Sequence, residues 1–163
     1  MEWDTDPDVY EVVQFSTDAN DVDEIQELTS TASDLPEIPS VRTTANKYQT
    51  LGGSFTLELE IEGSIQTSGL ISHAALSQAA GDRSTMQSII AAMKNINSLV
   101  SVSREGPDDE GGYEWKITFP SAMGNVPQMR LGQNYLTGTG ADVIVTTDRE
   151  GNLISGDFQL SYI

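Results

Sequence analysis

The chain of 163 residues contains no cysteine, which excludes disulfide bonds, zinc–thiolate sites and thiol catalysis. Basic residues are scarce: 8 Lys and Arg stand against 25 Asp and Glu, giving a net charge of -17. Such an acidic surface argues against binding to nucleic-acid phosphates or to anionic membranes. Long apolar runs are also missing, and none reaches the length of a membrane-spanning helix. We therefore expect neither nucleic-acid binding nor membrane insertion.

Residues that usually carry catalysis are few. His73 is the single histidine, and neither a strained serine turn nor a Gly-rich phosphate loop accompanies it. Glu58, Glu60 and Glu62 alternate along an expected strand, so we interpret them as its solvated face rather than as paired catalytic carboxylates. The sequence thus predicts that the protein is not an enzyme and has no catalytic residues. Calcium is the only cofactor that the acidic composition suggests.

The sequence is rich in repeats. Three 13-residue units follow one another, EVVQFSTDANDVD, EIQELTSTASDLP and EIPSVRTTANKYQ, and they begin at Glu11, Glu24 and Glu37. The spacing of their apolar residues is compatible with a helix. However, Ser/Thr clusters in every unit, together with Pro36 and Pro39, favour short strands or extended arms. We therefore predict an acidic arm or stalk, extended or β, over residues 1–40, with a helix as the alternative.

A second repeat has a much longer period. The stretch VRTTANKYQTLGGSFTLEL, which begins at Val41, aligns without a gap with IVTTDREGNLISGDFQLSY, which begins at Ile144, 103 residues later. Glycine matches glycine and phenylalanine matches phenylalanine in the two copies. We therefore predict that residues 41–143 form one β-rich module. Residues 144–163 are then the first strands of a following repeat, or a strand exchanged with another molecule.

Within the module, alternation of apolar and polar residues predicts strands in GGSFTLELEIEG, GSIQTSGLI, LVSVSR and YEWKITF. One or two further strands are expected in MRLGQNYLTGTGADVIVTT. The segment STMQSIIAAMKNI carries an apolar helical face, with Ser84 as its N-cap and Gln87 completing a capping box. We predict an α+β, mainly β fold: an antiparallel sheet in the order β-β-α-β-β-β with one covering helix. The aromatic residues of these strands are expected in the core.

These segments resemble a repeat found in very large extracellular proteins of algae, diatoms and oomycetes, related to modules of fibrocystin-like ectodomains and of phage virion proteins. The resemblance is carried by GGSFTLEL, QSIIAAMKNI, VSVSR, GGYEWKITF and NVPQM. The 13-residue units resemble short Glu-(Val/Ile)-Gln units that precede the module in the algal and oomycete proteins, although Pro39 replaces the Gln in the third unit. The resemblance implies an extracellular or cell-surface structural protein, such as part of a filament, a flagellar hair (mastigoneme) or a cell wall. It implies no catalytic residues.

A terminal strand without a partner suggests assembly by strand pairing, since an exposed strand edge readily pairs with another chain. The expected partners are other copies of the same repeat, in a homopolymer. The Ser/Thr clusters are candidate sites for O-linked sugars. The expected assembly interface combines apolar residues of the terminal strand with those of the first two 13-residue units: Phe158, Leu160, Tyr162, Val12, Phe15, Ile25 and Leu28.

The alternative hypothesis is a calcium-dependent adhesion module that binds carbohydrate or another surface. Asp108, Asp109 and Glu110 gather at a hairpin tip, and carboxylate oxygens are the ligands that calcium prefers. Tyr113 and Trp115 follow closely and could stack on a sugar. The exposure of Trp115 distinguishes the two hypotheses, because a sugar-binding aromatic side chain must reach the surface.

Overall fold

The computed structural model describes residues 19–20, 22–23, 25–96, 100–154 and 156–161. Contacts divide the chain into two parts, residues 1–30 and 31–163. In the first part, the described residues form neither helix nor strand, and Val22, Ile25 and Leu28 are exposed. The helical alternative for the 13-residue units therefore gains no support from these residues.

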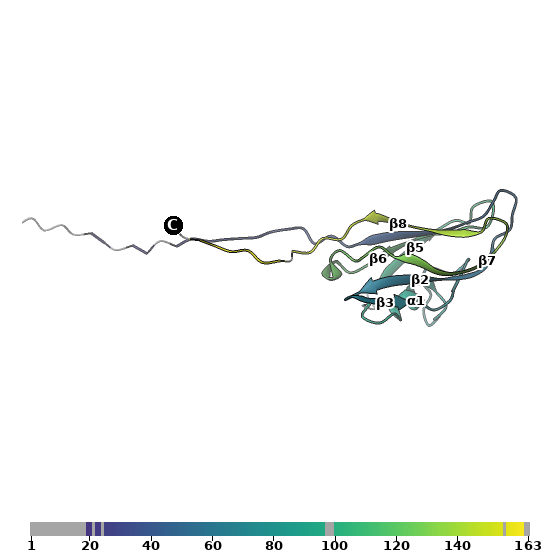
Figure 1. Cartoon of the computed structure of the whole chain (residues 1–163), viewed down its shortest axis with the longest axis horizontal. Coiled ribbons are helices and arrows are strands. Elements are labelled where there is room, and N and C mark those ends of the chain that lie inside the picture. The colour runs from purple at the N-terminus through teal and green to yellow at the C-terminus, as the bar shows by residue number, and fades with distance from the viewer. Residues whose placement is uncertain (1–18, 21, 24, 97–99, 155, 162–163) are drawn as a thin grey trace, which may run out of the picture. The chain divides into compact units, whose positions relative to one another are not determined.

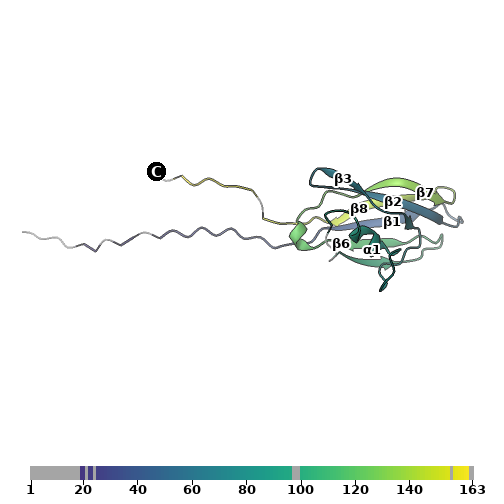
Figure 2. The same ribbon diagram turned by 90° about the horizontal axis from the view of Figure 1, so that it is seen from below.

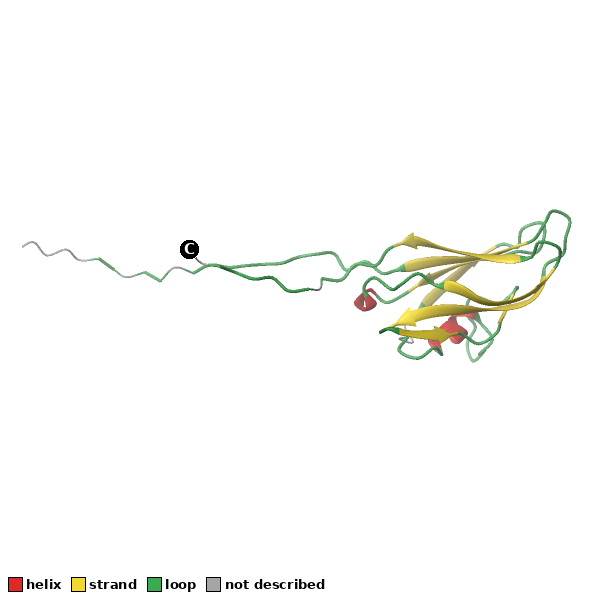
Figure 3. Cartoon of the chain, viewed as in Figure 1, coloured by secondary structure: helices red, strands yellow, loops and turns green. Residues whose placement is uncertain are grey.

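The second part contains the regular structure. The mainly β class with one α-helix, predicted from the sequence, is confirmed (Figure 3). In chain order, the elements are β1 (Ile38–Thr44), β2 (Gly52–Ile61), β3 (Ser64–Thr67), β4 (Ile71–Ser72), α1 (Met86–Ala91), β5 (Ser101–Glu105), β6 (Glu114–Thr118), the 3-10 helix η1 (Ser121–Met123), β7 (Arg130–Thr137) and β8 (Asp142–Arg149).

The strands form two antiparallel sheets where the sequence predicted one (Figure 1). The first sheet has the order β5-β6-β1-β8. In the second, β2 lies in the centre, with β3 and β4 along one side and β7 along the other. The two sheets share one hydrophobic core, in which Phe55 of β2 and Trp115 of β6 lie 6.2 Å apart between ring centroids. Alternation of period two is the same in both sheets, so it could not indicate how the strands would be divided between them.

Helix α1 begins one residue later than the sequence predicts. Its N-cap is Thr85, whose Oγ1 accepts a hydrogen bond from the Ser88 N–H at 3.1 Å. Ser84 instead donates its N–H and its hydroxyl to the Asp82 carboxylate at 2.7 and 2.6 Å, and these bonds lower the pKa of Asp82. The predicted capping box is also absent, because Gln87 donates its side-chain amide to a backbone carbonyl just before β5.

In the described part of the chain, no helix has the length and apolar character that crossing a membrane requires.

β1 and β8 lie side by side in the first sheet. Their pairing runs from Thr44 opposite Asp142 to Ile38 opposite Arg149. β1 thus begins before residue 41, the expected start of the module. Residues 144–149, for which the sequence predicts the start of a following repeat or an exchanged strand, complete the sheet of the module itself.

Candidate assembly interface

The chain segments that enter and leave the sandwich run antiparallel to each other at one end of it (Figure 2). Leu35 and Asn152 exchange two backbone hydrogen bonds, of 3.2 and 2.9 Å. Two side chains add to this pairing: Asn152 donates to the carbonyl of Ser33 at 3.2 Å, and Arg149 donates to that of Pro36 at 3.0 Å. The strand ladder between β1 and β8 is therefore continued outside the sandwich by side-chain and backbone bonds.

Glu37 connects these two segments from inside. It is only 2% exposed, and its Oε2 accepts a hydrogen bond from the Gly151 N–H at 2.6 Å. Burial raises the pKa of the Glu37 carboxyl and the charge of Glu150 adds to the rise, while hydrogen bonds from the backbone N–H groups of Gly151 and Val126 oppose it. Sequence reasoning missed this role. Two features of the sequence could have indicated it: a glutamate begins each 13-residue unit, and Gly151 follows the last expected strand of the module.

Gly151 is required at this point because of close backbone packing. A Cβ atom on Gly151 would overlap the carbonyl oxygen of Gly124. A Cβ on Gly124, whose φ is +64°, would lie 2.9 Å from the Cβ of Leu153. The first residues after β8 therefore pack directly on the loop that follows η1.

Beyond Leu153 the chain presents apolar side chains to solvent. Residues 156–161 form no strand, and Phe158 and Leu160 are 68% and 72% exposed. Their sequence equivalents in β2, Phe55 and Leu57, are both fully buried at 0% exposure. The C-terminal segment thus carries the apolar pattern of a central strand without the neighbours that would cover it.

The two copies of this pattern share an unusual backbone conformation. Gly53 in β2 has a φ of +83°, and its equivalent Gly156 has a φ of +97°. A Cβ on Gly53 would overlap the carbonyl oxygen of Tyr135 in β7, whereas nothing lies within 4 Å of the corresponding position on Gly156. In β2 the glycine permits close approach of a neighbouring strand. In the C-terminal segment the same conformation occurs with the space beside it unfilled.

Four of the seven residues predicted for the assembly interface fall in the described part of the chain. Phe158, Leu160, Ile25 and Leu28 are all exposed, as an interface requires. The other three, Val12, Phe15 and Tyr162, lie outside the described residues.

Two of the three carboxylates at the acidic hairpin tip accept hydrogen bonds from backbone N–H groups of the same chain. Asp108 Oδ1 accepts hydrogen bonds from the N–H groups of Gly112 and Glu110 at 2.6 and 3.2 Å, and its Oδ2 lies 3.8 Å from Arg42. Glu110 accepts a bond from a backbone N–H in the loop after β1, while Asp109 is exposed. Within the described ranges, no group of three or more acidic or histidine side chains is placed to hold a metal ion.

The aromatic side chains beside this tip face inward. Trp115 is fully buried, and its indole N–H donates to the Ala75 carbonyl at 3.0 Å, so the prediction that it belongs to the core is confirmed. Tyr113 is half-buried beneath the Arg104 guanidinium, which lies 4.3 Å from the ring centroid. Trp115 is therefore not available on the surface for stacking on a sugar.

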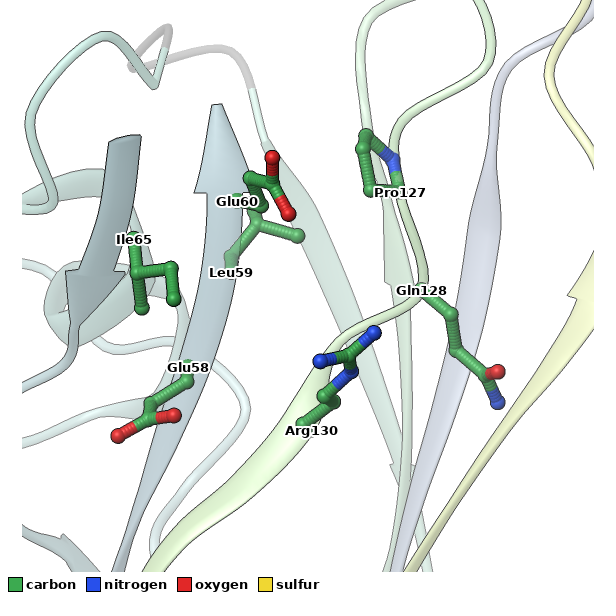
Figure 4. Close-up of a pocket in the computed structure, with 7 residues that line it drawn as sticks. All are labelled: Glu58, Leu59, Glu60, Ile65, Pro127, Gln128 and Arg130. Atoms are coloured by element: carbon green, nitrogen blue, oxygen red, sulfur yellow. The ribbon is translucent and has the colours of Figure 1, made fainter. Parts of the chain in front are cut away.

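A groove lies beside the C-terminal half of β2. Strand β7 pairs with β2 only as far as Glu58 opposite Arg130, so β2 continues past the start of its neighbour. Two hollows, of about 50 and 370 Å³, lie along this free stretch and the loop before β7, and Glu60 and Pro127 line both. Figure 4 shows the smaller one. We call this pair of hollows the β2 groove. The remaining residues that line it are Glu58, Leu59, Ile61, Glu62, Ile65, Asn95, Ala122, Met123, Asn125, Val126, Gln128 and Arg130.

Scans against protein-family models, against curated proteins and against solved structures found no match to this chain. The resemblance to the repeats of large extracellular proteins therefore stays a hypothesis from the sequence. The observations that bear on function are the exposed copy of the β2 pattern, the free end of β2 and the bonds that hold the two chain segments together.

Proposed function

We propose that this chain is a structural repeat module of an extracellular or cell-surface assembly, such as a filament, a flagellar hair or a cell wall. Its copies join by strand pairing, in which the C-terminal segment of one copy completes a sheet of another. The observation that carries this proposal is the exposure of Phe158 and Leu160 in a segment whose equivalent in β2 is buried.

The energetics favour such pairing. Fully burying a large apolar side chain contributes about 1.5–3 kcal/mol, so covering Phe158 and Leu160 offers a substantial driving force. Pairing also supplies backbone hydrogen bonds to a segment that forms no strand alone. The core of the sandwich contains no residue from 156–161, so one copy can fold before its segment is bound.

Deletion of residues 155–163 tests this function. The truncated chain is expected to keep the circular dichroism spectrum and melting temperature of the monomer, because it loses no core residue. Its assembly, measured by sedimentation and electron microscopy, should be lost. A matched control, Leu70→Ser, removes an apolar side chain that is exposed elsewhere on the surface and should assemble normally. Truncated protein that assembles like the full chain would contradict the proposal.

A further inference from the structure

We infer that the β2 groove is the acceptor site for residues 156–161 of a second copy of this chain. The inference rests on the proposed strand pairing and identifies the surface that the exchanged strand occupies. Three features support it: free backbone groups on β2, a partly apolar lining of suitable size, and the position at which the C-terminal segment leaves the sandwich.

The free backbone groups belong to Glu60. Leu57 directs its N–H and C=O toward the β3 side of β2, where they bond Ser68 at 2.9 and 2.8 Å. Because successive residues of a strand direct these groups to opposite edges, Glu58 and Glu60 direct theirs toward the β7 side. Glu58 is paired with Arg130, where β7 begins. The N–H and C=O of Glu60 therefore face the groove, where an added strand can bond to them.

The walls of the groove suit a strand with apolar residues at alternate positions. Ile61, Met123, Val126 and Pro127 line the larger hollow, whose volume is about 370 Å³. Figure 4 shows the smaller hollow, with Leu59 and Glu60 lying between the ribbon of β2 and Pro127. Phe158 and Leu160 are two residues apart and so project from the same face of an extended strand. One face of residues 156–161 would thus be buried in the groove.

The C-terminal segment leaves the sandwich next to this groove. Leu153 packs against Gly124, which lies between Met123 and Val126 of the larger hollow. None of residues 156–161 of the same copy lines the groove, so the site is free for a second copy. Donor and acceptor are different surfaces of one chain, so each copy can donate its segment to one neighbour and accept that of another, as an open homopolymer requires.

The outer edge of β8 is the competing acceptor, and its side chains protect it. Gln128 donates to the carbonyl of Val145 at 3.3 Å, and the Asp142 carboxylate accepts the N–H of Val143 at 2.8 Å. The β2 groove lacks this protection of its backbone groups.

Electrostatics give this interface a characteristic salt dependence. Glu58, Glu60 and Glu62 line the groove, the donor segment contains Asp157, and each copy carries a net charge of -17. Copies therefore repel each other at low ionic strength. Because salt screens this repulsion while apolar burial persists, association should strengthen between about 0.05 and about 0.5 M NaCl.

Site-directed cross-linking tests the acceptor site. Because the chain has no cysteine, Gln159→Cys and Ala122→Cys each introduce a single thiol, on the donor segment and on the groove wall. The two full-length variants, one carrying a size tag, are mixed under mild oxidation, and mixed dimers are counted on a non-reducing gel. The matched control pairs Gln159→Cys with Thr146→Cys, an exposed position on β8.

We expect mixed dimers with Ala122→Cys, more at high salt, and few with Thr146→Cys. Adding Phe158→Ser to the donor should reduce their yield about tenfold, as loss of a central apolar anchor does. Equal yields at the two acceptor positions, or a yield indifferent to Phe158→Ser, would overturn the inference. If deletion of residues 155–163 abolishes assembly but Ala122→Cys gives no mixed dimer, strand pairing stands and the acceptor is elsewhere. If the deletion leaves assembly intact and Ala122→Cys gives no mixed dimer, both proposals fail.

Discussion

Phe55 and Phe158 occupy equivalent positions in two copies of one sequence pattern, yet Phe55 is fully buried and Phe158 is 68% exposed. The glycine two residues before each of them has a positive φ in both copies. The copies differ in their neighbours: β2 has β3 and β4 on one side and β7 on the other, whereas residues 156–161 form no strand. The pattern thus confers the capacity to form a strand, and the neighbouring strands determine whether a strand forms.

The 13-residue units also show that neighbouring strands determine whether a repeated pattern becomes a buried strand. The third unit provides β1, where Val41 is fully buried between β6 and β8. Its equivalent in the second unit, Leu28, is exposed. The units share a register of apolar residues, so the difference again lies in the partners available to each.

The largest expected difference in unfolding free energy is between substitutions of Phe55 and of Phe158. Phe55→Ala should lower the free energy of unfolding by about 3–5 kcal/mol, because it leaves a cavity in the shared core. Phe158→Ala should change it by less than about 0.5 kcal/mol in the monomer, as expected for an exposed side chain. Urea unfolding of dilute protein measures both. A large loss from Phe158→Ala would show that the C-terminal segment is part of the folded monomer.

Substitution of Gly53 and Gly156 should change the free energy of unfolding by amounts that differ less than for the two phenylalanines. The larger loss is again expected in β2. Gly53→Ala is expected to cost roughly 2–3 kcal/mol, because its positive φ disfavours a Cβ by about 1–2 kcal/mol and the added atom displaces β7. Gly156→Ala should cost less than about 1 kcal/mol, because residues 156–161 belong to no helix or strand and the backbone can leave its positive φ without disturbing a neighbouring strand. Melting temperatures of the two variants provide the comparison. Equal shifts would mean that Gly156 already packs against a partner in the monomer.

The smallest expected effect on stability comes from Glu37, which bonds Gly151 where the chain leaves β8 toward the exposed C-terminal segment. Its pKa in the folded chain is raised above the ordinary value of 4.5, so the folded chain holds this proton more tightly than the unfolded chain does. The resulting stability is fully present below the unfolded pKa and is lost as pH rises through the folded pKa. The difference in unfolding free energy between wild type and Glu37→Gln should therefore fall as pH rises above about 4.5, and it should level off once pH has passed the folded pKa.

Unfolding free energy is measured against pH for both proteins. Subtracting the Glu37→Gln values from those of the wild type removes the contribution of the other carboxylates, which both proteins share. Dilute samples are needed at the acidic end, because the isoelectric point is about 4.1. A difference that rises with pH would mean that the N–H groups of Gly151 and Val126 outweigh the burial of the carboxylate.

The sequence predicted the elements better than their partners. The hairpin of β5 and β6 followed from clean alternation on both sides of a Gly- and Asp-rich turn. The N-cap was misplaced by one residue because Asp82 binds Ser84, a competition between adjacent hydroxyl groups that the capping pattern does not include. Residues 144–149 were predicted to begin a following repeat or to form an exchanged strand, because they resemble β1. Resemblance to a strand does not reveal that the two strands pair with each other.

The candidate site divides in the same way. The exposed apolar residues of the C-terminal segment were predicted, since their alternation is a local property of the sequence. The β2 groove was not, because it results from a difference in strand ends, β7 beginning opposite Glu58 while β2 continues to Ile61. Glu37 was also missed, since burial of a carboxylate depends on a glycine 114 residues away.

The antiparallel pairing of the segments that enter and leave the sandwich has a mechanical consequence. Tension applied to both segments would first load the bonds that Asn152 makes with Ser33 and Leu35, and then the bond from Gly151 to Glu37. The β1–β8 ladder would next open from Ile38 and Arg149 inward, pair by pair. Such unzipping breaks hydrogen bonds in succession and needs less force than shearing them together. A second copy seated beside β2 would leave this seam unreinforced, so under load the module would act as a yielding element rather than a rigid joint.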